Sequence, residues 1–163
     1  MKHGLLPKGY DMMLLIQVFH GIAATIWVGG IFFAYMALRP AANITLEPAQ
    51  RVKLWRSVYS HFFPWVWIMI NVLIITGYAG LFIRFDGFVN KMLYLNLMHG
   101  LGLLMVVLFF YLFFGLYRDL SNQVTTGDIT AAAKVVNKMR PVMAINLTLG
   151  LIISAIGIVG PAV

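Results

Sequence analysis

The chain has 163 residues, of which 61% are hydrophobic and only 10% are charged, and its formal net charge is +7. A soluble domain carries about 25% charged residues, so most of this surface cannot face water. The absence of cysteine excludes disulfides, thiolate metal sites and cysteine nucleophiles. Because the positive charge lies in the tails and loops, it indicates cytoplasmic loops near anionic lipid and argues against a nucleic-acid partner.

Four long apolar stretches predict an all-α polytopic membrane protein, with four transmembrane helices in a single domain over residues 1–163. The expected spans run roughly over residues 12–38, 64–83, 92–117 and 141–159. A helix over the first span is about 40 Å long, which exceeds the roughly 30 Å of a bilayer core. The lipid bilayer is therefore the first partner that the sequence predicts.

The loop between the first two spans, residues 40–61, predicts an interfacial helix that lies on the membrane surface. Arg39-Pro40 is expected to end the first span, Thr45 can cap the next helix, and Pro48 falls in its first turn. Four apolar side chains then recur at helical spacing on one face: Val52, Trp55, Tyr59 and Phe62. One apolar face with basic residues around it is typical of a helix at the bilayer surface.

The distribution of lysine and arginine predicts the orientation of the bundle. The loops that follow the first and third spans hold eight of these residues, against four at the opposite ends of the spans. Positive residues favour the cytoplasmic side, so we expect both long loops in the cytoplasm and both termini in the periplasm.

Two histidines lie inside the predicted spans, His20 in the first and His99 in the third. Each is roughly 12 to 14 Å from the start of its span, which places both at similar depth in the periplasmic half. Ionisable side chains at membrane depth are costly and indicate a functional site. Trp27 shares the helix face of His20, and Asn96 shares that of His99. The structural alternative is that the histidines form interhelical hydrogen bonds, for example with Asn96 or Ser154.

The methionines near the same end favour copper as the ligand of these histidines. Met13 and Met98 lie close to His20 and His99 in sequence, and thioethers together with imidazoles can bind Cu(I) without cysteine. His3 adds a nitrogen that can bind Cu(II) together with a free amino terminus. Methionine is also an ordinary filler of apolar helices, which is the alternative explanation.

Haem b is the other cofactor that fits the histidine pair. Two imidazoles at one depth on separate helices suit axial ligation of a haem iron, with electron transfer to or from a quinone. Small residues beside the histidines either let helices pack closely or leave room for a flat macrocycle. Lys91 opens the third span, where it either extends to the lipid headgroups or reaches a haem propionate.

The remaining polar residues indicate structural roles. His61 is expected at the membrane interface on the cytoplasmic side, away from His20 and His99. Asn71 and Asn146, in the cytoplasmic halves of their spans, are expected to hydrogen-bond to each other. No carboxylate pair, Ser-His-Asp set or HExxH motif is present, so no catalytic residue is assigned.

Three runs carry a resemblance to a known family: FHGIAATIWVGGIFFAYMALRPA, LEPAQRVKLWRSVYSHFFPWVW and LMHGLGLLMVVLFFYLFFGLYRDL. They resemble the small CopD-type membrane proteins of bacteria over nearly the whole chain. This resemblance implies copper resistance and copper uptake across the cytoplasmic (inner) membrane, with His20 and His99 as the residues that carry over. A periplasmic copper carrier is the protein partner that such a role implies.

The run HGIAATIWVGG is also similar to HemJ-type protoporphyrinogen oxidases, which are four-helix membrane proteins that bind haem b and act on a porphyrin. After the glycines this chain has FFAYMALRP, where that family has a Leu-Pro-Arg run. We therefore expect a copper protein whose metal ligands come from His20, His99, Met98, Met13 and His3. The alternative is a haem protein with a cofactor site built from His20, His99, Trp27, Asn96 and Lys91, which in that case is a membrane oxidoreductase.

Overall fold

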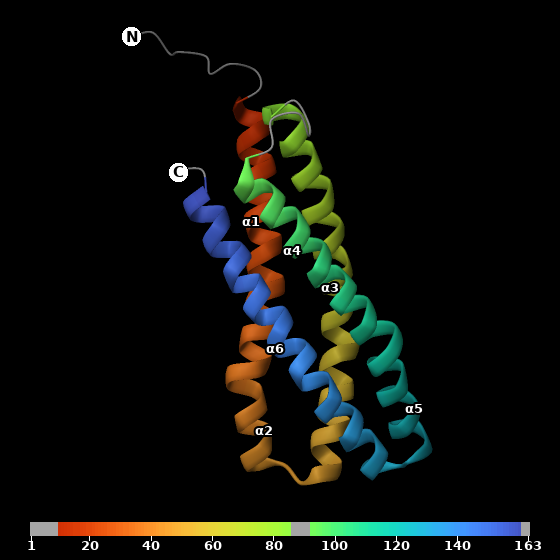
Figure 1. Ribbon diagram of the computed structural model, residues 1–163. Helices are drawn as coiled ribbons and strands as arrows, with labels where there is room; N and C mark the ends of the chain where they lie inside the picture. The colour runs from red at the N-terminus through yellow and green to blue at the C-terminus, as the bar shows by residue number, and fades with distance from the viewer. Residues whose placement is uncertain (1–9, 86–91, 161–163) are drawn as a thin grey trace.

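A computed structural model of the chain describes residues 10–85 and 92–160, and these residues form helices with no β-strand among them. Two stretches of π-helix, named η1 and η2, interrupt the α-helices without ending them. In chain order the elements are α1 (Tyr10–Phe33), η1 (Ala34–Leu38), α2 (Arg39–Thr45), α3 (Pro48–Phe85), α4 (Leu93–Phe110), η2 (Tyr111–Tyr117), α5 (Arg118–Thr126) and α6 (Ile129–Val159). Four long rods result, namely α1–η1–α2, α3, α4–η2–α5 and α6 (Figure 1).

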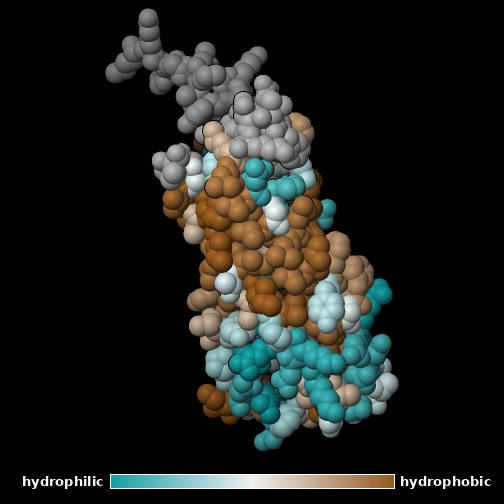
Figure 2. All heavy atoms as spheres, in the orientation of Figure 1, coloured by the Kyte–Doolittle hydropathy of each residue, from teal (hydrophilic) through white to brown (hydrophobic). Residues whose placement is uncertain are grey.

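All four rods are long and apolar enough to cross a membrane, which confirms the expected four-helix membrane bundle. The candidate spans within the rods contain 31 to 36 residues each and are therefore about 45 to 55 Å long, more than a bilayer core requires. On the face that Figure 2 shows, hydrophobic residues cover the middle of the bundle and hydrophilic residues gather at one end. That end carries the α2–α3 and α5–α6 connections, whereas the described chain begins and ends at the opposite end (Figure 1).

The interfacial helix expected over residues 40–61 is wrong as a separate element. Residues 48–61 are helical, but they are the first part of α3, which continues through Pro64 to Phe85 without a break. Trp55 and Tyr59 are only 6% and 3% exposed, so their face packs inside the bundle and not on lipid. The physical reason is length, because rods that extend beyond the bilayer need an apolar core there as well.

The expected end of the first span at Arg39-Pro40 is also wrong, because the helix continues to Thr45. Pro40 lies in the first turn of α2, directly after the π-turn, where its missing N–H interrupts no α-helical ladder. Thr45 does not cap α3; its hydroxyl donates to the Ala41 carbonyl at 2.8 Å, at the end of α2.

The turn between α5 and α6 follows from two residues with clear local roles. Gly127 has a φ of +80° and ends α5, a conformation that glycine adopts without a steric penalty. The Asp128 carboxylate then accepts a hydrogen bond from the Ala131 N–H at 2.8 Å, which caps the N-terminus of α6. These two residues return the chain into the bundle.

Aromatic side chains fill the middle of the bundle and hold its rods together. Phe109 is 1% exposed, and the edges of Phe63 and Trp67 meet it at ring-centroid distances of 5.4 Å each. Trp27 reaches the same ring from α1, at 6.4 Å. Around this aromatic core α1 packs mainly along α3, and α4 packs mainly along α6. The interface between α1 and α3 is where the first histidine lies.

Candidate functional site

His20 faces α3 from the middle of α1, half-buried, and its hydrogen bond defines its tautomer. The His20 Nδ1 atom lies 2.8 Å from the Thr76 hydroxyl oxygen, and that hydroxyl lies 2.6 Å from the Val72 carbonyl oxygen. Thr76 has one hydroxyl hydrogen and donates it to Val72, so its oxygen accepts the hydrogen bond from His20 Nδ1–H. In the neutral form of the ring, which is the form that ligates metals, Nε2 is then the unprotonated nitrogen.

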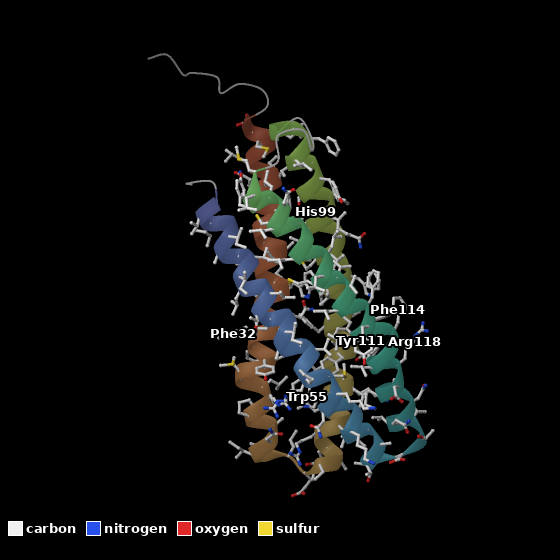
Figure 3. All side chains as sticks on the ribbon, in the orientation of Figure 1. Phe32, Trp55, His99, Tyr111, Phe114 and Arg118 are labelled. Atoms are coloured by element: carbon white, nitrogen blue, oxygen red, sulfur yellow. The ribbon has the colours of Figure 1, made fainter. Side chains whose placement is uncertain are left out.

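His99 approaches the same turn of α3 from the other side. Its ring meets the Tyr78 ring edge-on, with 5.5 Å between the centroids, and the side chain is exposed (Figure 3). The His20 Cε1 atom lies 3.5 Å from the position that a Cβ would take at Gly77, so glycine lets the imidazole lie close to α3. We call the group His20, His99, Thr76, Gly77 and Tyr78 the histidine site.

The predicted methionine ligands separate into two interfaces. The Met13 methyl group lies against Gly80 of α3, 3.6 Å from the Cβ position there, on the same α1–α3 interface as His20. The Met98 methyl group lies against Gly157 of α6, 3.3 Å from its Cβ position. Neighbouring helix residues point about 100° apart, so Met98 and His99 face different rods.

The other predicted site residues are placed as follows. Trp27 is 4% exposed and belongs to the aromatic core. Asn96 is exposed, one turn before His99 on α4. His3 and Lys91 lie outside the described residues.

The interhelical partner of His20 is Thr76 and not either of the polar residues expected from the sequence. The Ser154 hydroxyl donates to the Gly150 carbonyl of its own helix at 2.8 Å. A threonine followed by glycine in an otherwise apolar span is a signal for such a contact, but only the packing of α1 on α3 shows which histidine it meets. Thr76 is therefore the site residue that sequence reasoning missed.

The expected hydrogen bond between Asn71 and Asn146 is not formed. Asn71 is exposed, and its amide donates to the Trp67 carbonyl of its own helix at 2.8 Å. Asn146 is 1% exposed, and its Oδ1 has no hydrogen-bond partner among the described residues. His61 is exposed in the first half of α3, where its Nδ1–H donates to the Ser57 carbonyl at 2.8 Å.

The glycines of the bundle divide into close-packed and open positions. A Cβ at Gly30 would collide with the Phe62 ring, and one at Gly150 would lie 2.7 Å from a Val28 methyl group. Helix packing therefore accounts for these positions. Besides Gly127 in the turn, four glycines within the helices have no neighbouring atom within 4 Å of the Cβ position: Gly21, Gly29, Gly100 and Gly102. Gly21 and Gly100 directly follow the two histidines. The helix surface is therefore open at the position that follows each histidine.

Within the described part of the chain, no three His, Asp or Glu side chains come together as a metal-binding group. Residues 56–159 match the family model described as copper resistance protein D. The match covers Thr76 and His99, whereas His20 lies before it. It supports the resemblance to CopD-type proteins and shows no similarity to HemJ-type oxidases. No curated protein and no solved structure matches the chain.

Proposed function

Because the chain belongs to the copper resistance protein D family, we propose that it takes up Cu(I) at the histidine site, on the periplasmic side of the bacterial cytoplasmic membrane. The protein is a multi-pass membrane protein related to copper resistance. In this proposal copper is the cargo, and the bundle provides a binding site for it within the membrane. Uptake or homeostasis is the role that such a site serves.

The tautomer of His20 carries this proposal. A histidine that ligates a metal usually donates its other N–H to a hydrogen-bond acceptor, which fixes the ring and its tautomer. Thr76 supplies that acceptor at 2.8 Å and leaves Nε2 as the ligating atom. A neutral ring that donates Nδ1–H to Thr76 can bind a metal through Nε2 without losing a proton.

The neighbouring groups suit a soft cation. Met13 lies on the same α1–α3 interface as His20, and His99 lies beside Tyr78 of the same α3 turn. Imidazole and thioether ligands select Cu(I) over hard cations such as Mg²⁺ and Ca²⁺. Met98, which packs against α6, and His3, which lies outside the described residues, remain in the proposed ligand set. A periplasmic copper carrier is the proposed partner.

The two ends of the bundle support the proposed periplasmic placement. The end with the α2–α3 and α5–α6 connections is hydrophilic (Figure 2), and its loops hold eight of the twelve Lys and Arg residues. The positive-inside rule directs that end to the cytoplasm, so the histidine site lies in the periplasmic half.

Substitution of the histidines tests the proposal. In purified protein under reducing conditions, we expect His20→Ala and His99→Ala each to lower Cu(I) affinity at least tenfold in competition with a chromophoric chelator. His61→Ala is the matched control, because this exposed histidine lies in the other half of the bundle. An unchanged copper stoichiometry in the His20→Ala/His99→Ala double variant contradicts the proposal.

Haem b is the second candidate, and the open glycines favour it. Gly21 and Gly100 directly follow the two histidines, and no atom lies within 4 Å of their Cβ positions, so the helix surface next to each histidine position is uncovered. His20 and His99 would hold the iron, which supplies one-electron chemistry when bound, and a quinone is the proposed electron partner. Lys91 remains the predicted partner of a propionate.

An ultraviolet–visible spectrum of the purified protein distinguishes the two candidates. A Soret band with sharp α and β bands after dithionite reduction supports haem, and His20→Ala then alters these bands. A colourless sample that binds Cu(I) at the histidines supports copper.

A further inference from the structure

A small cavity lies in the hydrophilic half of the bundle, away from the histidine site. Its volume is about 20 Å³, and α2, α3 and α6 all contribute to its wall. The lining includes Arg39, Arg140, Trp55, Tyr59 and Met143. Trp55 marks its position in Figure 3, near the end that carries the α2–α3 connection. A space of this size holds about one water-sized group.

Two arginines on different rods share the wall of this cavity. Arg39 is half-buried on α2, and it lies close enough to Arg140 of α6 for the two positive charges to repel each other. The charged groups of the described chain that act on Arg39 include no carboxylate. Its guanidinium carbon instead lies 5.7 Å from the centre of the Tyr35 ring. Two like charges beside a partly desolvated cavity cost free energy that a bound anion offsets.

The hydroxyl group of Tyr59 is a third hydrogen-bond donor at this wall. Tyr59 is 3% exposed, and its hydroxyl donates to the Met143 sulfur at 3.2 Å. A thioether is a weak acceptor, whereas a buried tyrosine hydroxyl usually pairs with a stronger one. An oxygen anion in the cavity offers this hydroxyl a better acceptor than sulfur.

The π-turn η1 brings Arg39 toward the cavity. Ala34, the first residue of η1, is buried. The next buried residue along the chain is Ala42, whereas Ala41 is exposed. An uninterrupted α-helix buries a residue seven positions on, which is Ala41, so η1 adds one residue to the turn. That residue rotates all following side chains back by about 100°. Arg39 is thereby moved from the outer side of the rod to the edge of its buried face.

We propose that Arg39, Arg140 and Tyr59 form an anion site that binds a phosphate group. The guanidinium N–H groups match the geometry of phosphate oxygens and form strong, charge-assisted hydrogen bonds with them. The cavity has room for about one oxygen of the group and leaves the rest of the ligand outside. Both the phosphate of an anionic lipid and free phosphate meet this requirement. Basic pockets between transmembrane helices at the cytoplasmic side bind lipid headgroups in this way.

Thermal unfolding of the whole chain in a neutral detergent tests the site. The probes are phosphatidylglycerol in mixed micelles, phosphatidylcholine as the uncharged comparison, and inorganic phosphate at constant ionic strength. We expect phosphatidylglycerol, inorganic phosphate or both to raise the unfolding midpoint of the unaltered protein. Arg39→Gln and Arg140→Gln each remove one charge-assisted partner, so each lowers the affinity about tenfold to a hundredfold.

The matched control is Arg118→Gln. Arg118 lies on the outer side of the same half of the bundle (Figure 3), with its guanidinium carbon 5.3 Å from the centre of the Phe114 ring, and it does not line the cavity. This variant loses the same charge and keeps the response of the unaltered protein. If anions are attracted only to the positive surface in general, all three variants should instead show the same loss of response to the anionic probes.

The outcomes separate the sources of the phosphate group. A response to phosphatidylglycerol alone assigns the site to a lipid, and a response to inorganic phosphate alone assigns it to a free anion. No response to either probe, or equal loss in the Arg39, Arg140 and Arg118 variants, overturns the site. If the arginine variants do not fold, Tyr59→Phe keeps both charges and the ring. An unchanged affinity in Tyr59→Phe contradicts the three-residue site.

Discussion

The two ends of the bundle present polar side chains of opposite kinds, an electron-pair donor at one end and positively charged hydrogen-bond donors at the other. In the histidine site, His20 donates to Thr76 at 2.8 Å and presents a nitrogen lone pair. In the cavity at the other end, Arg39 and Arg140 present only hydrogen-bond donors and positive charge. One end therefore suits a soft cation, and the other suits an anion, although both lie in the same four rods.

This difference indicates that the bundle is not a simple path for a cation from one side to the other. A cation that leaves the histidine site toward the hydrophilic end approaches two arginines without a carboxylate between them, which is unfavourable. An anion bound between Arg39 and Arg140 reduces that barrier. Occupancy of the anion site is therefore expected to matter for any movement of Cu(I) through the bundle.

The largest expected effect comes from the aromatic core that joins the two ends. Phe109 is 1% exposed and contacts Phe63, Trp67 and Trp27. We expect Phe109→Ala to lower the free energy of unfolding by about 3–5 kcal/mol, because it removes buried surface and leaves a cavity. Thermal or denaturant unfolding in detergent measures this change, and copper and phosphate binding should weaken together.

Phe110→Ala is the control for this prediction, because Phe110 is 40% exposed and lies next to Phe109 in sequence. Its ring contacts Trp67 at 5.2 Å, so about 1 kcal/mol of stability depends on it. Equal losses in the two variants contradict the view that Phe109 joins the ends.

The four-helix membrane bundle was predictable because its signal is local. A long apolar stretch requires its backbone hydrogen bonds to be satisfied within a helix, and no tertiary information is needed to see it. The sequence shows that the face of Val52, Trp55 and Tyr59 is apolar, but the prediction that this face lies on lipid is wrong. An apolar helix face packs equally well on lipid or on other helices, and only the extension of the rods beyond the bilayer decides between the two.

The histidines were predictable as candidates because an ionisable residue in an apolar span is conspicuous. The role of Thr76 was not predictable, because it depends on which helices are neighbours and on how each is rotated about its axis. The π-turns could not be predicted from the sequence either, because the residues of η1 are ordinary apolar ones. The shift in register shows in the burial of Ala42 in place of Ala41.

Thr76→Val tests the histidine site separately from the anion site, because it alters only the end of the bundle that carries the histidines. Valine has a similar shape but cannot accept the His20 Nδ1–H, so the ring loses its fixed orientation. Loss of such a supporting hydrogen bond lowers metal affinity about tenfold to a hundredfold. Cu(I) competition measures this, and the phosphate response is expected to stay unchanged.

Thr148→Val is the matched control for this variant. The Thr148 hydroxyl donates only to the Ala144 carbonyl of its own helix, at 3.0 Å, so copper affinity should not change. If Thr76→Val binds Cu(I) as tightly as the unaltered protein while His20→Ala does not, the hydrogen bond does not orient the ligand.

The smallest expected effect concerns two glycines in the half of the bundle that carries the histidines. An added methyl group at Gly150 meets Val28 at 2.7 Å and Met105 at 3.3 Å, whereas Gly102 has open space. Alanine favours a helix by about 1 kcal/mol over glycine, and overpacking typically costs about 1–3 kcal/mol. We therefore expect Gly150→Ala to lose about 1 kcal/mol net and Gly102→Ala to gain about 0.5–1 kcal/mol. Unfolding midpoints measured side by side give the sign of each change. A gain in both variants means that α6 is free to move away from α1, and the contact at Gly150 then does not hold the histidine half together.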